Sequence, residues 1–213
     1  MIFFQGYMKY WREDYSSILA YMYEHMIISL TVIALSITFS IPLAVYLTKI
    51  KSDLIKTITF NIANIFQTIP TIALLALVIP LFGIGFVPAV VALFLYSLLP
   101  LLRNTYAGMN SIDPGIIEAA KGMGYGTIQR LFKIELPVAL PYIMSGIRVT
   151  SVYIISWTTL AALIGAGGLG DLVLAGIGYN DSMMIFTGTF LAIIIAISLD
   201  LVINKIEKIF SYS

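Results

Sequence analysis

The charged residues of the 213-residue chain divide it into segments, because four long stretches contain no Asp, Glu, Lys or Arg. These stretches cover residues 25–48, 57–102, 149–170 and 182–199. A transmembrane helix needs about 20 mainly apolar residues, so the first, third and fourth stretches each hold one span, the last by continuing to about Leu201. The second stretch is long enough for two spans. Its middle, residues 80–88, contains two prolines and two glycines, which favour a turn over a helix.

This pattern predicts an all-α integral membrane protein with about five transmembrane helices. The predicted spans are residues 26–48, 57–81, 87–106, 142–164 and 183–204. Together they make one predicted transmembrane domain, residues 26–213, in which a charged loop, residues 107–141, joins the third span to the fourth.

Lysine and arginine set the predicted orientation of this bundle. Ten of the 12 basic residues lie on one side of it: after the first span, around the loop between the third and fourth spans, or after the fifth span. Short loops rich in lysine and arginine stay in the cytoplasm. We therefore expect the N-terminus outside the cell, and the 107–141 loop and the C-terminus in the cytoplasm.

Residues 1–25 differ from the rest of the chain because they mix eight Phe, Tyr and Trp residues with charged ones. Amphipathic aromatic side chains prefer the headgroup level of a membrane. We expect these residues to form an amphipathic segment on the outer surface, ahead of the transmembrane domain.

Composition agrees with a membrane protein and excludes several kinds of site. Hydrophobic residues make up 60% of the chain and charged residues 11%, whereas soluble domains carry about 25% charged residues. The net charge of +1 gives no electrostatic basis for binding nucleic acid. The absence of cysteine and the single histidine, His25, exclude disulfides and thiolate or multi-histidine metal sites. No paired carboxylates or activated nucleophile lie near the membrane, so an enzyme is not predicted.

The cytoplasmic loop contains signals for two short helices. Asp113 followed by Pro114 is a favourable helix start, because the carboxylate caps free N–H groups and the proline ring already has a helical φ. Three glycines between residues 122 and 126 allow a sharp turn, after which a second short helix, about residues 127–134, is predicted. Prolines then lead into the fourth span. The predicted geometry is helix, turn, helix across the cytoplasmic mouth of the bundle.

The same loop carries a spaced motif: Glu-Ala-Ala, three residues, Gly, nine residues, Ile, any residue, Leu-Pro. Its positions are Glu118, Ala119, Ala120, Gly124, Ile134, Leu136 and Pro137. Here the chain resembles the permease subunits of bacterial ATP-binding-cassette importers, and the resemblance implies the type I, binding-protein-dependent importer fold. In that family this loop is a coupling helix that docks in a groove on the ATPase. The resemblance implies that Glu118 meets a basic group there, that Ala119 and Ala120 form the contact face, and that Gly124 makes the turn.

Three further segments, residues 67–77, 80–85 and 99–106, resemble the osmoprotectant branch of this family, whose members import glycine betaine, carnitine or choline. The implied function is the transmembrane subunit of an ATP-driven importer of such quaternary amines. Residues 164–171 also resemble methionine permeases, so a permease for methionine or another small amino acid is the alternative. A stand-alone channel or carrier is the less favoured one, because no charge lies near the bilayer midplane to support proton coupling.

The resemblance also implies partners in the bacterial cell membrane: two ATPase subunits inside, an identical or homologous second permease, and an extracellular substrate-binding protein. A P-loop ends in Gly-Lys-Ser or Gly-Lys-Thr, and no lysine in this chain follows a glycine. We therefore expect no cofactor in this chain, with ATP and magnesium bound by the partner ATPase.

Four residues are candidates for the transport pathway. Tyr153 and Trp157 lie four positions apart, on one face of the fourth span, and aromatic faces attract quaternary ammonium groups. Gln67 and Thr68 are polar residues within the second predicted span, just before Pro70. Ordinary packing against a neighbouring helix is the competing explanation for all four.

A glycine-rich segment follows the fourth span and contains Gly165, Gly167, Gly168 and Gly170. Its spacing matches the dinucleotide-binding fingerprint, but that fingerprint requires a preceding strand, and here a membrane helix precedes it. We expect instead a tight or re-entrant turn that forms a gate beside the pathway, since irregular backbone is tolerated where protein or water satisfies it.

Overall fold

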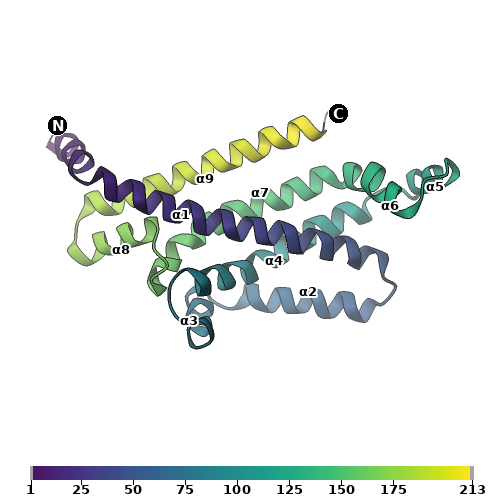
Figure 1. Ribbon diagram of the computed structural model, residues 1–213, viewed down its shortest axis with the longest axis horizontal. Helices are drawn as coiled ribbons and strands as arrows, with labels where there is room; N and C mark the ends of the chain where they lie inside the picture. Colours follow the sequence, from purple (N-terminus) through teal and green to yellow (C-terminus); the bar gives the residue numbers. More distant parts are fainter. Residues whose placement is uncertain (1, 212–213) are drawn as a thin grey trace.

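The computed structural model describes residues 2–211, and these residues form helices and no strand (Figure 1). The helices are α1 Ile2–Lys49, α2 Asp53–Thr68, α3 Thr71–Phe82, α4 Phe86–Asn110, α5 Pro114–Gly122, α6 Thr127–Arg130, α7 Leu136–Ala161, α8 Leu169–Tyr179 and α9 Ser182–Ser211. A π-helical turn, Leu131–Glu135, precedes α7, and a 3₁₀ turn, Ala162–Ile164, follows it. Four helices are long and apolar enough to cross a membrane, or five spans if α2 and α3 together count as one. The predicted all-α membrane fold is confirmed.

Helix α1 extends well beyond the predicted first span. It is one helix of 48 residues, about 70 Å long at 1.5 Å per residue, and it has no break near residue 25. The predicted boundary between an outer segment and the first span is therefore not a break in the helix, because the sequence there contains no proline or glycine that would end it. Figure 1 shows α1 reaching from one end of the bundle to the other.

The second predicted span, residues 57–81, is two helices instead of one. Helices α2 and α3 are bent by 104° at the break between them. The break falls at Ile69 and Pro70, and Ile69 is extended, with ψ 131°, because a residue before proline is pushed out of the helical region. The Tyr96 hydroxyl of α4 donates a hydrogen bond to the Ile69 carbonyl oxygen, which satisfies an acceptor at the break.

Two glycines, one on each helix, let α4 and α7 pack closely together. A Cβ added at Gly108 would lie 2.5 Å from the Cβ of Tyr142, and one added at Gly146 would lie 2.7 Å from the Cβ of Asn104. Glycines at such crossings let two membrane helices approach closely and gain packing energy. These two contacts run antiparallel along the helices, so they fix α7 relative to α4 over a full turn or more.

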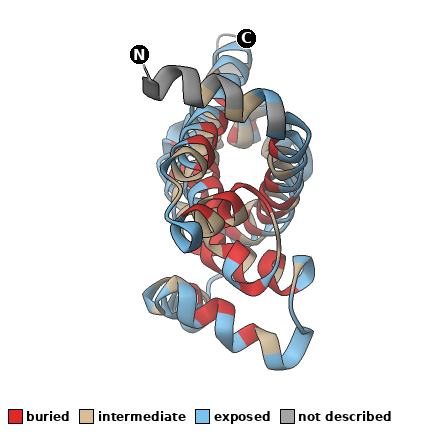
Figure 2. Cartoon of the chain, turned by 90° about the vertical axis from the view of Figure 1, so that its left-hand side faces the viewer, coloured by how far each residue is buried: buried red, intermediate tan, exposed pale blue. Residues whose placement is uncertain are grey.

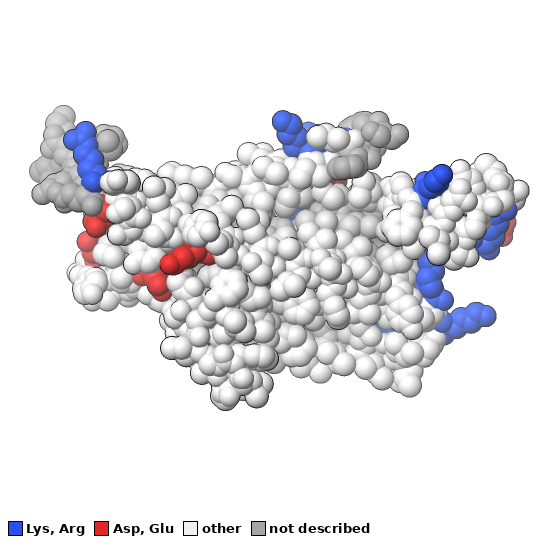
Figure 3. Space-filling model, in the orientation of Figure 1, with Lys and Arg blue, Asp and Glu red and all other residues white. Residues whose placement is uncertain are grey.

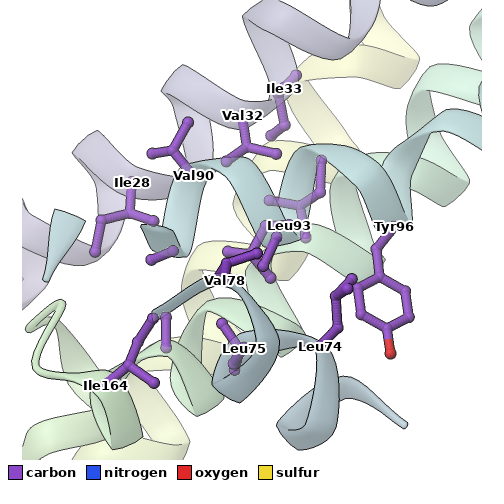
Figure 4. Close-up of a cluster of buried hydrophobic side chains, with 14 residues drawn as sticks. Ile28, Val32, Ile33, Leu74, Leu75, Val78, Val90, Leu93, Tyr96 and Ile164 are labelled. Carbon is purple, nitrogen blue, oxygen red and sulfur yellow. The ribbon is translucent and has the colours of Figure 1, made fainter. Parts of the chain in front are cut away.

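The main core joins α1, α3 and α4 at the half of the bundle that contains the α3–α4 turn (Figure 4). Ile28 and Val32 of α1 meet Leu75 of α3 and Leu93 of α4, all at most 1% exposed. Further along α1 and α4, the hydroxyls of Ser36 and Ser97 share a buried hydrogen bond. Hydroxyl pairs of this kind link membrane helices.

The outer faces of the bundle are apolar, as a lipid environment requires. Figure 2 shows buried residues turned toward neighbouring helices and exposed residues around the outside. Among the exposed ones are Leu81, Ile194 and Leu201, at 78%, 41% and 60%. In Figure 3 acidic side chains gather at the end that holds α8, and basic side chains gather mainly at the opposite end, beside α5 and α6. This distribution agrees with the predicted cytoplasmic position of the 107–141 loop.

Candidate coupling and pathway sites

The predicted helix-turn-helix of the cytoplasmic loop is present, and we name residues 113–130 the coupling hairpin. The Asp113 carboxylate accepts a hydrogen bond of 2.6 Å from the Gly115 N–H, and Pro114 begins α5. Gly124 adopts φ +85°, and its N–H donates to the Lys121 carbonyl oxygen at 2.9 Å. Only glycine adopts this left-handed geometry without strain. Gly124 is therefore the turn residue.

The motif residues of the hairpin differ in exposure. Glu118 and Ala119 are exposed, but Ala120 is fully buried, so the expectation that both alanines form an exposed contact face is wrong for Ala120. Its side chain faces inward because Glu118 and Ala119 occupy the outer side of this short helix. The face available to a partner consists of Glu118, Ala119 and exposed apolar residues, among them Met123 and Ile128, at 68% and 74%.

The last three motif residues lie where the hairpin joins the bundle. Ile134 is half-buried in the π-helical turn, Leu136 packs on the cluster around Met109 and Ile143, and Pro137 is in the first turn of α7. Their positions favour a role in seating the hairpin on α4 and α7.

The residue between Ile134 and Leu136 carries a feature that sequence reasoning missed. Glu135 is 1% exposed, and both of its carboxylate oxygens are used. One accepts from the Arg130 Nε at 2.7 Å, and the other accepts from the Lys49 Nζ. Lys49 is the last residue of α1 and Arg130 the last of α6, so this single carboxylate joins the hairpin to α1. A signal was present in the sequence, since Glu135 stands between apolar motif positions.

The aromatic pathway candidates form a column across two helices. The rings of Tyr153 and Trp157 lie 5.3 Å apart between centroids, and Trp157 lies 4.8 Å from Tyr96 of α4. Tyr153 is 44% exposed and Tyr96 is buried, so the column runs from a free surface of α7 into the core. Tyr96 was not a predicted site residue, because its position beside Trp157 depends on how α4 packs against α7.

The polar pathway candidates lie at the break between α2 and α3. Thr68 is exposed, and its hydroxyl donates to the Ile65 carbonyl oxygen at 2.8 Å, while Gln67 is half-buried. Tyr96 connects the two candidate groups, since its ring contacts Trp157 and its hydroxyl bonds to the Ile69 carbonyl. The structure thus brings the polar and aromatic candidates to the same region of the chain.

The predicted gate segment is an irregular turn, which we name the glycine loop, residues 164–170. Gly165, Gly167 and Gly168 have φ of +72°, +85° and +87°, values that require glycine. Gly170 lies at the start of α8 instead, and a Cβ there would come within 2.0 Å of the Thr159 carbonyl oxygen. Each of the four glycines is therefore needed, three for conformation and one for close packing.

Two hydrogen bonds fasten the glycine loop to its neighbours. The Gly168 N–H donates to the Glu24 carboxylate of α1 at 2.9 Å, and the Gly85 N–H at the start of α4 donates to the Ile164 carbonyl oxygen at 2.8 Å. Burial, together with the nearby Glu24 charge, raises the pKa of the Asp171 carboxyl in α8. Because the loop bonds to Glu24 and leads into α8, it lies at the acidic end of the bundle (Figure 3). Across residues 2–211, no group of three or more His, Cys, Asp or Glu is arranged to hold a metal ion.

Comparison with known proteins adds a family match and close relatives. A family model described as "binding-protein-dependent transport system inner membrane component" matches residues 36–211. The choline transport system permease protein OpuBB of Bacillus subtilis (strain 168) is 44% identical over 186 residues, which cover 87% of this chain and 85% of that protein. The osmoprotectant import permease protein OsmW of Salmonella typhimurium is 40% identical over 192 residues, which cover 88% of each protein.

Solved structures support the same fold at lower sequence identity. A chain of the MetNI methionine ABC transporter, in an inward-facing conformation, matches with a TM-score of 0.79 and 24% identity, covering 91% of this chain and 95% of that one. A chain of an amino acid ABC transporter crystallised with histidines matches with a TM-score of 0.71 and 17% identity, covering 94% of this chain and 96% of that one. The helix arrangement described above is therefore that of a type I importer permease.

Proposed function

The chain belongs to the family of binding-protein-dependent transport system inner membrane components, and we propose that it is the transmembrane subunit of an ATP-driven importer of quaternary-amine osmoprotectants. It is a multi-pass protein of the cell membrane. The observation that carries the proposal is the 44% identity, over 87% of the chain, to a permease named for choline transport. A second relative, the glycine betaine/carnitine/choline transport system permease protein OpuCB of Bacillus subtilis (strain 168), is 43% identical over a similar length.

The aromatic column supports a quaternary-amine substrate. Choline, carnitine and glycine betaine share a trimethylammonium group, which is attracted to the faces of tryptophan and tyrosine. Tyr153 exposes nearly half of its surface, and its ring lies tilted against that of Trp157, so a passing cation can reach an aromatic side chain on α7. Residues 149–161 of α7 contain no charged residue, so the substrate's ammonium group meets no lysine or arginine within that stretch.

A permease for methionine or another small amino acid is the second candidate, since the MetNI chain shares the fold. The MetNI chain shares 24% sequence identity with this chain, against 44% for the choline permease. At 24% identity the match supports the fold alone. The quaternary-amine substrate is therefore the stronger proposal.

Partners supply the energy and the substrate in this proposal. An ATPase pair binds ATP and magnesium and docks on the coupling hairpin, where Glu118 meets a basic group and the exposed apolar residues fill a groove. An extracellular protein delivers the substrate to the acidic end of the bundle, and a second permease, identical or homologous, completes the pathway. This chain performs no hydrolysis itself.

The transport cycle follows from two packings of a rigid bundle. ATP draws the two ATPases together, and the coupling hairpins move with them. The bundle then opens outward and accepts substrate from the binding protein. Hydrolysis separates the ATPases and returns the bundle to the inward-facing packing, which releases substrate into the cell.

Competition in proteoliposomes tests the proposal. The complex, purified from its native membrane through a tag on this chain and reconstituted with its binding protein, should take up labelled choline, carnitine or glycine betaine only when ATP is present inside. Excess unlabelled quaternary amine should compete, and excess methionine should not. Uptake of methionine in preference to all three amines would overturn the substrate assignment, and uptake without ATP would support a carrier.

A further inference from the structure

Glu135 is the only described acidic residue that bonds both to the coupling hairpin and to α1. It is buried in the π-helical turn that separates the hairpin from α7, and π-helical turns concentrate at functional positions. Removing one partner of a buried ionic cluster leaves the other charges uncompensated. The hairpin therefore cannot shift relative to α1 without either breaking these ion pairs or moving α1 with it.

The middle of α1 holds the glycine loop by a second specific contact, at Glu24. The Glu24 carboxylate accepts the Gly168 N–H at 2.9 Å, and a Cβ added at Gly167 would lie 2.4 Å from a Glu24 carboxylate oxygen. The loop thus fits against Glu24 with no space to spare. Between Glu24 and Lys49 runs an unbroken helix, about 40 Å long at 1.5 Å per residue, which is close to the full thickness of a bilayer.

We propose that Glu135 is the positioning residue that transmits movement of the coupling hairpin to α1, and that α1 carries this movement across the membrane to the glycine loop. The inference rests on the proposed function, because it requires an ATPase that moves the hairpin. It adds a defined route from the ATPase side to the outer gate. The route begins with Arg130, Glu135 and Lys49 at the C-terminal end of α1, and it reaches Glu24 and Gly168 about 40 Å away along the same helix. Lys49 is 39% exposed while Glu135 is 1% exposed, so the carboxylate is the fixed centre of this cluster.

A cysteine accessibility reporter in the glycine loop tests the route directly. The chain contains no cysteine, and Ala166 is a half-buried residue of the glycine loop, so Ala166→Cys places one thiol there and leaves Glu24, Gly167 and Gly168 unchanged. This variant, assembled with its partners in proteoliposomes, should react at that cysteine with a membrane-impermeant maleimide at a rate that changes at least about fivefold when ATP and binding protein are added. Adding Glu135→Gln to the reporter should remove that ATP effect, although the loop contacts α1 at Glu24, about 40 Å along the helix from Lys49.

Measurements on variants in vesicles prepared in the same way complete the design. In the chain without the reporter, Glu135→Gln should leave ATPase binding and ATP hydrolysis within about twofold of normal but lower substrate uptake per ATP by at least about fivefold. The control Asp53→Asn removes an exposed ion pair with Lys56 on the same side of the membrane, and it should change neither the uptake ratio nor the ATP effect. An unchanged ATP effect in the Glu135→Gln reporter would overturn the inference while the original complex still transports. Absence of ATP-driven uptake by the original complex would overturn the proposed function and this inference together.

Discussion

Replacing Gly170 with alanine should separate α8 from α7 at the glycine loop. The new Cβ would lie 2.0 Å from the Thr159 carbonyl oxygen and 2.8 Å from the Ala162 Cβ. Thr159 presents a backbone atom, so no side-chain rotation relieves the clash and one helix has to move. Inserting a methyl group into a filled site costs about 1–3 kcal/mol, and the backbone contact places Gly170→Ala at the upper end of that range.

Gly178 provides the matched control, because it lies on the same helix and a Cβ there meets nothing within 4 Å. Alanine is more favourable than glycine within a helix by about 0.5–1 kcal/mol. The two variants add the same methyl group to α8, yet Gly170→Ala should lower the thermal unfolding temperature in detergent and Gly178→Ala should leave it unchanged or raise it. Tryptophan fluorescence follows the transition. Equal unfolding temperatures for the two variants would refute the close packing of the glycine loop.

Four further outcomes follow from the described contacts. Glu118→Lys should abolish uptake while the chain still inserts, because it reverses the charge offered to the ATPase; normal uptake would contradict the coupling assignment. Gly124→Pro should also abolish uptake while the chain still inserts, since proline cannot adopt φ +85° and the turn of the coupling hairpin is lost. Co-purification of the ATPase with this variant at the normal level would argue against Gly124 as the turn residue needed for docking. Trp157→Leu should raise the transport KM by about two- to thirtyfold, the loss of one cation–π contact of about 0.5–2 kcal/mol, measured with labelled choline. The raised pKa of Asp171 means that the fold favours its protonated form, so its contribution to stability is present at low pH and is lost as pH rises through the folded pKa. Asp171→Asn should therefore raise the unfolding temperature at pH 7 and not at pH 3. A rise at pH 3 and not at pH 7 would contradict this sign.

Helix content and the coupling hairpin were predictable because both depend on local sequence. Uncharged stretches of sufficient length locate membrane helices, and Asp113, Pro114 and Gly124 each act on the backbone within a few residues. The bend between α2 and α3 was missed for a different reason. Both halves of residues 57–81 are apolar, so hydropathy alone gives one span, and Pro70 was the only local sign that the helix ends before Ile69.

The remaining site features depend on contacts between distant parts of the chain. Lys49 and Glu135 are separated by 86 positions, and each reads as an ordinary charge in a cytoplasmic segment. The burial of Ala120 and the ring contact between Tyr96 and Trp157 likewise depend on how helices pack together, which periodicity does not specify. The glycine loop was predicted as a turn, but its contact with Glu24 required the fold.

Uptake of a labelled quaternary amine into vesicles holding the purified complex tests the central claim most directly. The account predicts uptake that requires internal ATP and the extracellular binding protein. Unlabelled choline, carnitine or glycine betaine should inhibit this uptake by competition, and Glu118→Lys should abolish it. Uptake that proceeds without ATP, or ATP-driven uptake that only methionine or another amino acid competes for, would contradict it.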